Sequence, residues 1–137
     1  MTIIIKNKET LLIDNFKFRC SVGKKGFSRS KKEGDLKTPS GIFDLGNIYY
    51  RQDRIEKPIS KLKLIRIKKN MGWCDDPNSK KYNKLIKIKK NLKISYEKLF
   101  RKDNKYDLFI LIKYNYNKII KNKGSAIFLD LTKNYTS

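Results

Sequence analysis

Leu108-Phe109-Ile110-Leu111-Ile112 is the longest uninterrupted apolar run in the chain, and it decides the fold class. Five apolar residues in succession suit a strand buried on both faces, whereas a membrane helix needs about 20. Similar dense runs occur at residues 3–5, 42–45 and 126–131. We expect all four runs to form central strands, and we expect no membrane span.

Three further stretches alternate apolar and polar residues, which is the period of a strand with one buried face. They lie at residues 16–22, 62–67 and 86–88. In the first stretch one face would carry Phe16, Phe18, Cys20 and Val22. Cys20 is therefore predicted to be a small core residue.

The length of 137 residues supports one packed core. No internal repeat, Gly/Ser linker or break in composition divides the chain. The only helix that the sequence predicts is short, over residues 94–100, with Ser95 as a possible cap. We therefore expect a single, mainly β domain over residues 1–137.

The 34 Lys and Arg residues outnumber the 13 Asp and Glu residues and give a net charge of +21. Most of this excess is Lys, and Lys, Ile and Asn together make up 58 of the 137 residues. Codons rich in A and T encode all three, so a genome of low G+C content explains the composition without a polyanionic partner. The alternative is nucleic acid or an anionic envelope polymer held by counterion release. Nucleic acid is the less favoured partner, because Arg, which reads guanine bidentately, is scarce.

Histidine is absent, and the two cysteines, Cys20 and Cys74, do not form a CxxC pair. This excludes every mechanism that depends on imidazole and every zinc site with His ligands. It also excludes a structural zinc site and a disulfide scaffold. We expect neither a metal nor a cofactor.

Three stretches go beyond what a plain β domain requires. Residues 33–41 form a turn-rich loop that Pro39 and Gly41 would close tightly. Gly72-Trp73-Cys74-Asp75-Asp76-Pro77 gathers the only Trp, a thiol and two carboxylates, and Tyr82-Asn83 follows closely. The third stretch, residues 124–131, is an apolar strand that carries one charged residue, Asp130.

The carboxylates of these stretches allow more than one interpretation. Asp75 and Asp76 could bind a cation or hold the donors of a partner loop, but adjacent side chains diverge, so capping of a turn is favoured. An unpaired buried carboxylate is costly, so Asp130 must lie at the exposed end of its strand, have a partner, or belong to a functional site.

Taken in order, these stretches resemble the L,D-transpeptidase family, the YkuD-type catalytic domain of bacterial cell-wall enzymes. Six ordered elements carry the resemblance: Arg19-Cys20 with Gly23, Lys31 to Phe43, Tyr50 to Arg54, Gly72 to Pro77, Tyr82-Asn83, and Gly124 to Leu129. The resemblance implies a β-sandwich-type fold and cysteine acyl transfer on the peptide stems of peptidoglycan.

The resemblance also implies roles for individual residues. The substrate cleft would be lined by Tyr82, Asn83, Gly124 and Ser125. The residues that shape it would be Gly34, Asp35, Thr38, Pro39, Gly41, Trp73, Cys74, Asp75 and Asp76. The family implies the periplasm or cell envelope, although no export signal is visible in the sequence.

The sequence departs from the family at the two catalytic positions. The family's His is replaced by Asp130, and its Thr-x-Gly-Cys nucleophile motif would begin just after Ser137. We therefore expect a domain that lacks the final strand with the nucleophile and is impaired in catalysis. A carboxyl with a pKa of about 3.9 is a poor base for a thiol of about 8.5 unless burial raises its pKa strongly.

Two alternatives to an impaired transpeptidase remain open. One is a non-catalytic peptidoglycan-binding module that keeps the cleft, and the other, less favoured, is a basic nucleic-acid-binding β protein. Cys74 is the only alternative nucleophile worth considering, and the sequence does not predict the oligomeric state.

Overall fold

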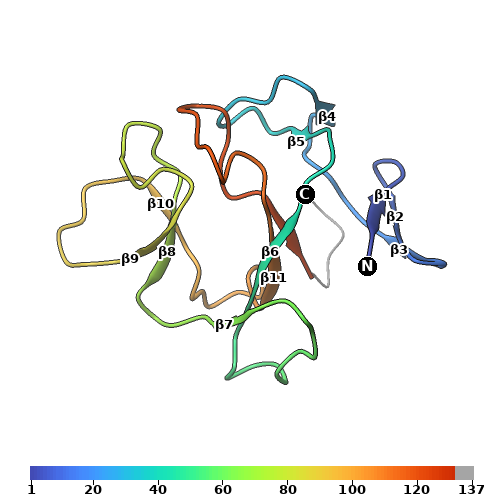
Figure 1. Cartoon of the computed structure of the whole chain (residues 1–137). Coiled ribbons are helices and arrows are strands. Elements are labelled where there is room, and N and C mark those ends of the chain that lie inside the picture. Colours follow the sequence, from blue (N-terminus) through green and yellow to red (C-terminus); the bar gives the residue numbers. More distant parts are fainter. Residues whose placement is uncertain (132–137) are drawn as a thin grey trace.

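The computed structural model describes residues 1–131 and shows an all-β chain (Figure 1). Within these residues, twelve short strands form four sheets, and there is no helix. They include no apolar helix of membrane-spanning length.

The central sheet has four strands in the order β12-β11-β6-β7. They are β12 (Phe128–Asp130), β11 (Leu108–Ile112), β6 (Leu45–Tyr50) and β7 (Leu64–Arg66). The apolar run that decides the fold class forms β11, which is paired on both sides, as the sequence predicts. Strands β6 and β7 are parallel, so both end at the same edge of the sheet.

A second sheet packs against the central one and has the order β10-β8-β9. Its strands are β10 (Tyr96–Lys98), β8 (Met71–Cys74) and β9 (Leu85–Lys87), all antiparallel. Trp73 of β8 is fully buried, and its ring meets those of Tyr49 and Phe128 edge-on at 6.0 and 5.1 Å. These rings join the two sheets into one core, completed by Ile67, Leu99, Tyr106, Phe109 and Leu111.

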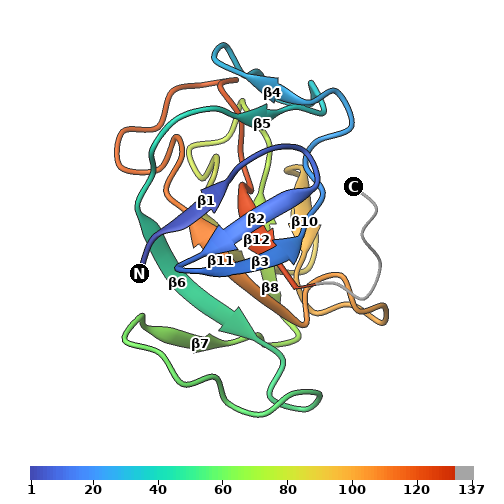
Figure 2. The same ribbon diagram turned by 90° about the vertical axis from the view of Figure 1, so that its right-hand side faces the viewer.

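The amino-terminal residues form a separate three-stranded sheet, β1-β2-β3, of β1 (Ile3–Ile5), β2 (Thr10–Ile13) and β3 (Phe16–Arg19). It lies on the side of the central sheet away from β8, β9 and β10 (Figures 1 and 2). A short parallel pair, β4 (Phe27–Ser28) and β5 (Thr38–Pro39), connects it to the rest of the chain.

The helix predicted over residues 94–100 is wrong. Tyr96–Lys98 forms strand β10 instead and pairs with Gly72–Cys74 of β8. The stretch is too short for its apolar spacing to distinguish a helix from a strand. The free edge of β8 supplies backbone partners that local sequence cannot reveal.

Two further details differ from the sequence-based expectations. Phe16 and Phe18 are 68% and 51% exposed, and Cys20 follows the strand and is only partly buried. Alternation predicts which residues share a face, but it does not predict that this face meets the core. Strand β6 begins at Leu45, so the run that starts at Ile42 enters the sheet later than expected.

Candidate functional site

Asp35 organises the loop at residues 31–41. Its carboxylate accepts hydrogen bonds from Lys31 Nζ at 2.8 Å and from the backbone N–H groups of Lys32 and Lys37 at 2.8 and 3.0 Å. Partial burial opposes ionisation, but these bonds outweigh it and lower the pKa of Asp35 to about 2. Gly34 provides a positive φ of 73° within this turn, which explains the need for glycine there.

The end of the same loop is fixed through β5. Thr38 Oγ1 accepts a hydrogen bond from the Gly23 N–H at 2.7 Å, and Pro39 is buried. Gly41 has a φ of 146° and lies against the Phe43 ring, so a side chain there would clash. These residues therefore shape the loop.

Glu33 joins this loop to the other two stretches. Its Oε1 accepts hydrogen bonds from Tyr82 Oη at 2.7 Å and from Ser125 Oγ at 2.6 Å. The Tyr82 oxygen in turn accepts the Gly124 N–H at 2.9 Å. Burial, followed by the Glu33 carboxylate, raises the pKa of Tyr82. The structure thus brings together Tyr82, Gly124 and Ser125 through Glu33.

Sequence reasoning did not single out Glu33 as a site residue. A glutamate within a turn-rich loop is usually solvated, and the motif Lys-x-Glu-Gly-Asp was the only signal. Gly124 is required by geometry, because its φ is 120° and a Cβ there would meet Lys31 and Tyr114 at 3.1 and 3.3 Å.

Asn83 is almost fully buried and uses its whole hydrogen-bonding capacity inside the protein. Its Oδ1 accepts from Trp73 Nε1 at 2.9 Å and from the Ala126 N–H at 3.0 Å. Its Nδ2 donates to the carbonyls of Tyr114 and Asn115 at 3.3 and 2.6 Å. An amide offers two donor hydrogens and two acceptor lone pairs, so none remains for a ligand. Asn83 therefore positions the surrounding loops rather than contacting a substrate.

Asp75 and Asp76 hold the segment that leads into β10. Asp75 Oδ1 accepts from Ser95 Oγ at 2.6 Å, and Asp76 accepts from the backbone N–H groups of Ser95 and Asn78 at 3.2 and 3.0 Å. The two carboxylates thus bind different donors, as capping groups do. Residues 1–131 contain no cluster of His, Cys, Asp and Glu that could hold a metal ion.

The two cysteines are poorly suited to nucleophilic attack. Cys74, the last residue of β8, is part of the buried core and has no exposed surface. Cys20 lies at the end of the amino-terminal sheet, where partial burial and then Glu9 raise the pKa of its thiol. Nucleophilic cysteines need an accessible thiol with a lowered pKa, and neither residue meets both conditions.

Asp130 ends strand β12 and has an unusual environment. Its Oδ1 is shielded from solvent and has no hydrogen-bond partner within residues 1–131. Burial raises the pKa of Asp130 to about 7, Lys105 opposes this shift and Glu97 adds to it. Glu97 itself accepts a hydrogen bond from Tyr106 Oη at 2.6 Å and lies 3.7 Å from Lys105 Nζ. The proton affinity of Asp130 is therefore close to that of an imidazole.

These features define a β-rich domain in which three distant loops interlock beside a strand that ends in a proton-binding group. Comparison with known families identifies that class: the family model of the L,D-transpeptidase catalytic domain, YkuD, matches residues 1–135. The chain belongs to this family, as its sequence motifs indicate. Comparison with curated proteins and with solved structures gives no match.

Proposed function

We propose that this domain acts on the peptide stems of peptidoglycan, and that its 137 residues bind a stem without completing acyl transfer. The observation that carries the proposal is the interlocking of the family's motifs through Glu33, Tyr82 and Asn83. This framework would hold the loops of a stem-binding cleft. What the 137 residues lack is a thiol suited to the reaction.

The family's reaction sets the chemical requirements. A cysteine thiolate attacks the carbonyl carbon before the terminal D-residue of one stem, and the C–N bond breaks as that residue leaves as a protonated amine. The amine of a second stem then attacks the thioester carbonyl, the C–S bond breaks to release the thiolate, and the base takes up the proton lost by the amine. The new amide bond cross-links the stems. A base must take the thiol proton, and N–H donors must stabilise the oxyanion.

Asp130 can serve as the base that takes the thiol proton better than an ordinary aspartate could. The raised pKa of about 7 reduces the mismatch with a thiol of about 8.5 to between 1 and 2 units. A carboxylate at the position of the family's His can thus serve as a base. Within these 137 residues, the lack of an accessible, reactive thiol, rather than the replaced His, would then limit catalysis.

Binding and chemistry can be tested separately on the same protein. The chain is incubated with a tetrapeptide-stem muropeptide while binding is followed by calorimetry, and with a carbapenem while intact mass is followed. We expect measurable stem binding, no adduct and no cross-linked or trimmed product. Loss of binding in Glu33→Ala, but not in the exposed-site control Glu56→Ala, would support the proposed cleft. A covalent adduct on Cys74, or no stem binding at all, would contradict the proposal.

A second experiment tests the role of Asp130. The chain is extended by a strand that carries Thr-x-Gly-Cys, with and without Asp130→His and Asp130→Asn. We expect the extended chain to form a carbapenem adduct at a rate that rises with pH through about 7. Asp130→Asn should slow that reaction by about 100-fold or more, the usual contribution of a general base. An extended chain that reacts only with His at position 130 would contradict a role for the carboxylate.

A further inference from the structure

A basic groove crosses the edge of the central sheet at which β6 and β7 end. It consists of two adjoining depressions of about 530 and 270 Å³, which share Lys69 and Phe100. Its walls come from residues 51–54 after β6, residues 66–69 at the end of β7, and residues 98–102 after β10. The groove thus unites segments that are far apart in the sequence.

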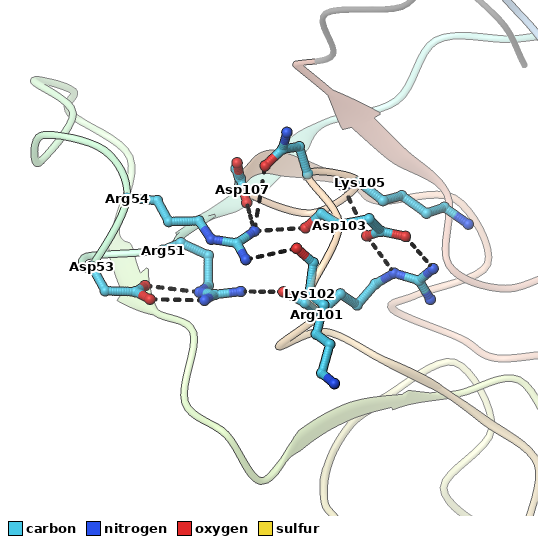
Figure 3. Close-up of polar contacts among 9 residues, drawn as sticks. Arg51, Asp53, Arg54, Arg101, Lys102, Asp103, Lys105 and Asp107 are labelled. Carbon is cyan, nitrogen blue, oxygen red and sulfur yellow. Dashed lines mark hydrogen bonds and ion pairs between the residues drawn. The ribbon is translucent and has the colours of Figure 1, made fainter.

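Arginine clamps hold one wall of this groove in place (Figure 3). Arg51 donates to both oxygens of Asp53 at 2.8 Å and to the Arg101 carbonyl at 2.7 Å, and its guanidinium lies 3.5 Å from the centre of the Phe100 ring. Its side chain is only 4% exposed. This wall is therefore formed before any ligand arrives.

A second pair of clamps completes the wall. Arg54 donates to Asp107 Oδ1 at 2.8 Å and to the carbonyls of Asp103 and Lys102 at 2.6 and 2.9 Å. Arg101 binds both oxygens of Asp103 at 2.8 and 2.6 Å. Arg51 and Arg54 thus fasten residues 51–54 to residues 101–107, and Arg101 braces the second segment internally, as Figure 3 shows. The motif Tyr50 to Arg54 thus has a structural role that its sequence alone does not explain.

The remaining cations of the groove are not neutralised in this way. Five exposed side chains have no ion-pair partner within the described residues 1–131: Arg66, Lys68, Lys69, Lys98 and Lys102. The three clamping arginines pair with three carboxylates, so the groove keeps a net charge of +5. This charge is concentrated along one preformed surface.

Codon composition does not explain where the arginines lie. A low G+C content favours Lys over Arg, and the chain has only six Arg residues. Four of those six, Arg51, Arg54, Arg66 and Arg101, line this groove. Their concentration at one edge of the sheet therefore indicates that this site requires arginine, which codon composition does not explain.

The shape of the groove indicates the kind of anion that fits. The five free cations come from two segments far apart in the sequence, residues 66–69 and 98–102, and all are exposed, so they suit a row of spaced negative charges better than one enclosed ion. Arg66 offers a planar fork and the lysines offer point charges, both of which bind phosphate oxygens. Among the described residues 1–131, Phe100 is the only aromatic ring that lines the groove, and Arg51 covers one of its faces. Single-stranded nucleic acid would need aromatic faces on which its bases stack.

We infer that this groove binds a linear phosphodiester polymer without bases, such as a polyol phosphate chain, through Arg66, Lys68, Lys69, Lys98 and Lys102. The site does not depend on the proposed activity toward peptide stems. It would attach the domain to an anionic polymer while the loops around Glu33 remain free.

The test must separate this groove from the general charge of a +21 protein. The groove variant changes its five free cations together: R66Q, K68Q, K69Q, K98Q and K102Q. The control variant removes the same charge at exposed lysines outside the groove: K6Q, K17Q, K24Q, K118Q and K121Q. Both variants are first shown to keep the melting temperature of the parent chain. Binding of a poly(glycerol phosphate) oligomer is then measured by calorimetry over a range of salt concentrations.

We expect the groove variant to bind about 30-fold more weakly than the parent at about 50 mM salt, and the control to change by about threefold or less. The slope of log Kd against log salt should flatten by about 3 in the groove variant alone. Equal losses in both variants would show binding by diffuse charge and overturn the inference. Tighter binding of a single-stranded oligonucleotide with the same number of phosphates would also overturn it and make the groove a nucleic-acid site.

Discussion

Two regions of the protein differ in whether polar atoms shielded from solvent have hydrogen-bond partners. One is the network around Glu33 and Asn83, and the other is the environment of Asp130. Asn83 matches all four of its hydrogen-bonding positions, and Glu33 receives the hydroxyls of Tyr82 and Ser125. Asp130 leaves one buried oxygen without a partner within residues 1–131. Saturated groups hold a structure in one arrangement, whereas an unsatisfied carboxyl keeps its capacity to bind a proton. The difference separates residues that hold the loops together from a carboxyl that can still take up a proton.

The largest effect is expected when the fully hydrogen-bonded amide of Asn83 is removed. Asn83→Ala leaves the Trp73 Nε1–H, the Ala126 N–H and two carbonyls without partners, and it puts Ala at a φ of 56°. We expect a loss of about 3–5 kcal/mol in the free energy of unfolding, measured by urea denaturation.

The matched control is Asn91→Ala, because Asn91 is exposed and has a similar φ of 66°. It should cost about 1 kcal/mol, which is the backbone contribution alone. Equal losses in the two variants would mean that the hydrogen bonds of Asn83 contribute nothing.

At Asp130, in contrast, a substitution should raise the free energy of unfolding at neutral to alkaline pH rather than lower it. Its pKa rises from an ordinary value of 3.8 to about 7 on folding, so the folded chain binds the extra proton between those values. Stability should therefore fall as the pH rises from about 4 to about 7 and level off above that. Asp130→Asn should remove this dependence and stabilise the chain at pH 8 by about 1–3 kcal/mol.

Melting curves at several pH values measure this effect, and Asp14→Asn is the control because Asp14 is exposed. A parent chain whose melting temperature does not fall over this range, or an Asp130→Asn variant that is destabilised at pH 8, would show that the carboxyl has a partner after all.

Asp35 should show the reverse pH dependence in the loop that shapes the site. Its pKa of about 2 lies below the ordinary 3.8, so its contribution is present above about pH 4 and is lost as the pH falls through about 2. Asp35→Asn should cost about 1–2 kcal/mol at pH 7, since three donors lose a charged acceptor. The loss should become much smaller when the same unfolding experiment is repeated at pH 2, where only about half of the folded carboxyls stay ionised. A loss that persists there in full would point to packing rather than charge.

The smallest effect is expected at the caps before β10. Asp76→Ala removes the acceptor of the Ser95 and Asn78 N–H groups and should cost about 1 kcal/mol in urea denaturation. Addition of calcium or zinc should change neither the parent nor the variant. A metal-dependent rise in the melting temperature of the parent that Asp76→Ala abolishes would make the pair a ligand site.

The pattern of apolar residues along the chain predicts several of the strands. The apolar run at 108–112 predicts β11 with both ends correct, and the runs near Leu64, Ile86 and Phe128 each contain a strand. The sequence does not predict β10, because its pairing with β8 is a contact between distant segments. For the same reason it does not predict the exposure of Phe16 and Phe18, which depends on where their sheet lies.

In the candidate site, too, the sequence singles out some residues and only the structure reveals others. The motifs single out Tyr82, Gly124 and Ser125, which lie together in the structure, but the roles of Glu33 and of the clamp between Arg51 and Asp53 emerge only from the folded arrangement. The sequence marks Asp130 as unusual, yet it assigns the group an ordinary acidity. Its pKa is raised mainly by burial, and the burial of a single side chain depends on the folded structure, not on the local sequence.

The position of Trp73 gives this protein a built-in optical reporter. It is the only tryptophan, it has no exposed surface, and its indole N–H is bound to the same Asn83 oxygen that holds Ala126. Intrinsic fluorescence excited in the tryptophan band therefore comes from one ring at the junction of core and loops. Any opening that lets water reach this junction will shift the emission to longer wavelengths, so the state of the network can be followed without a label.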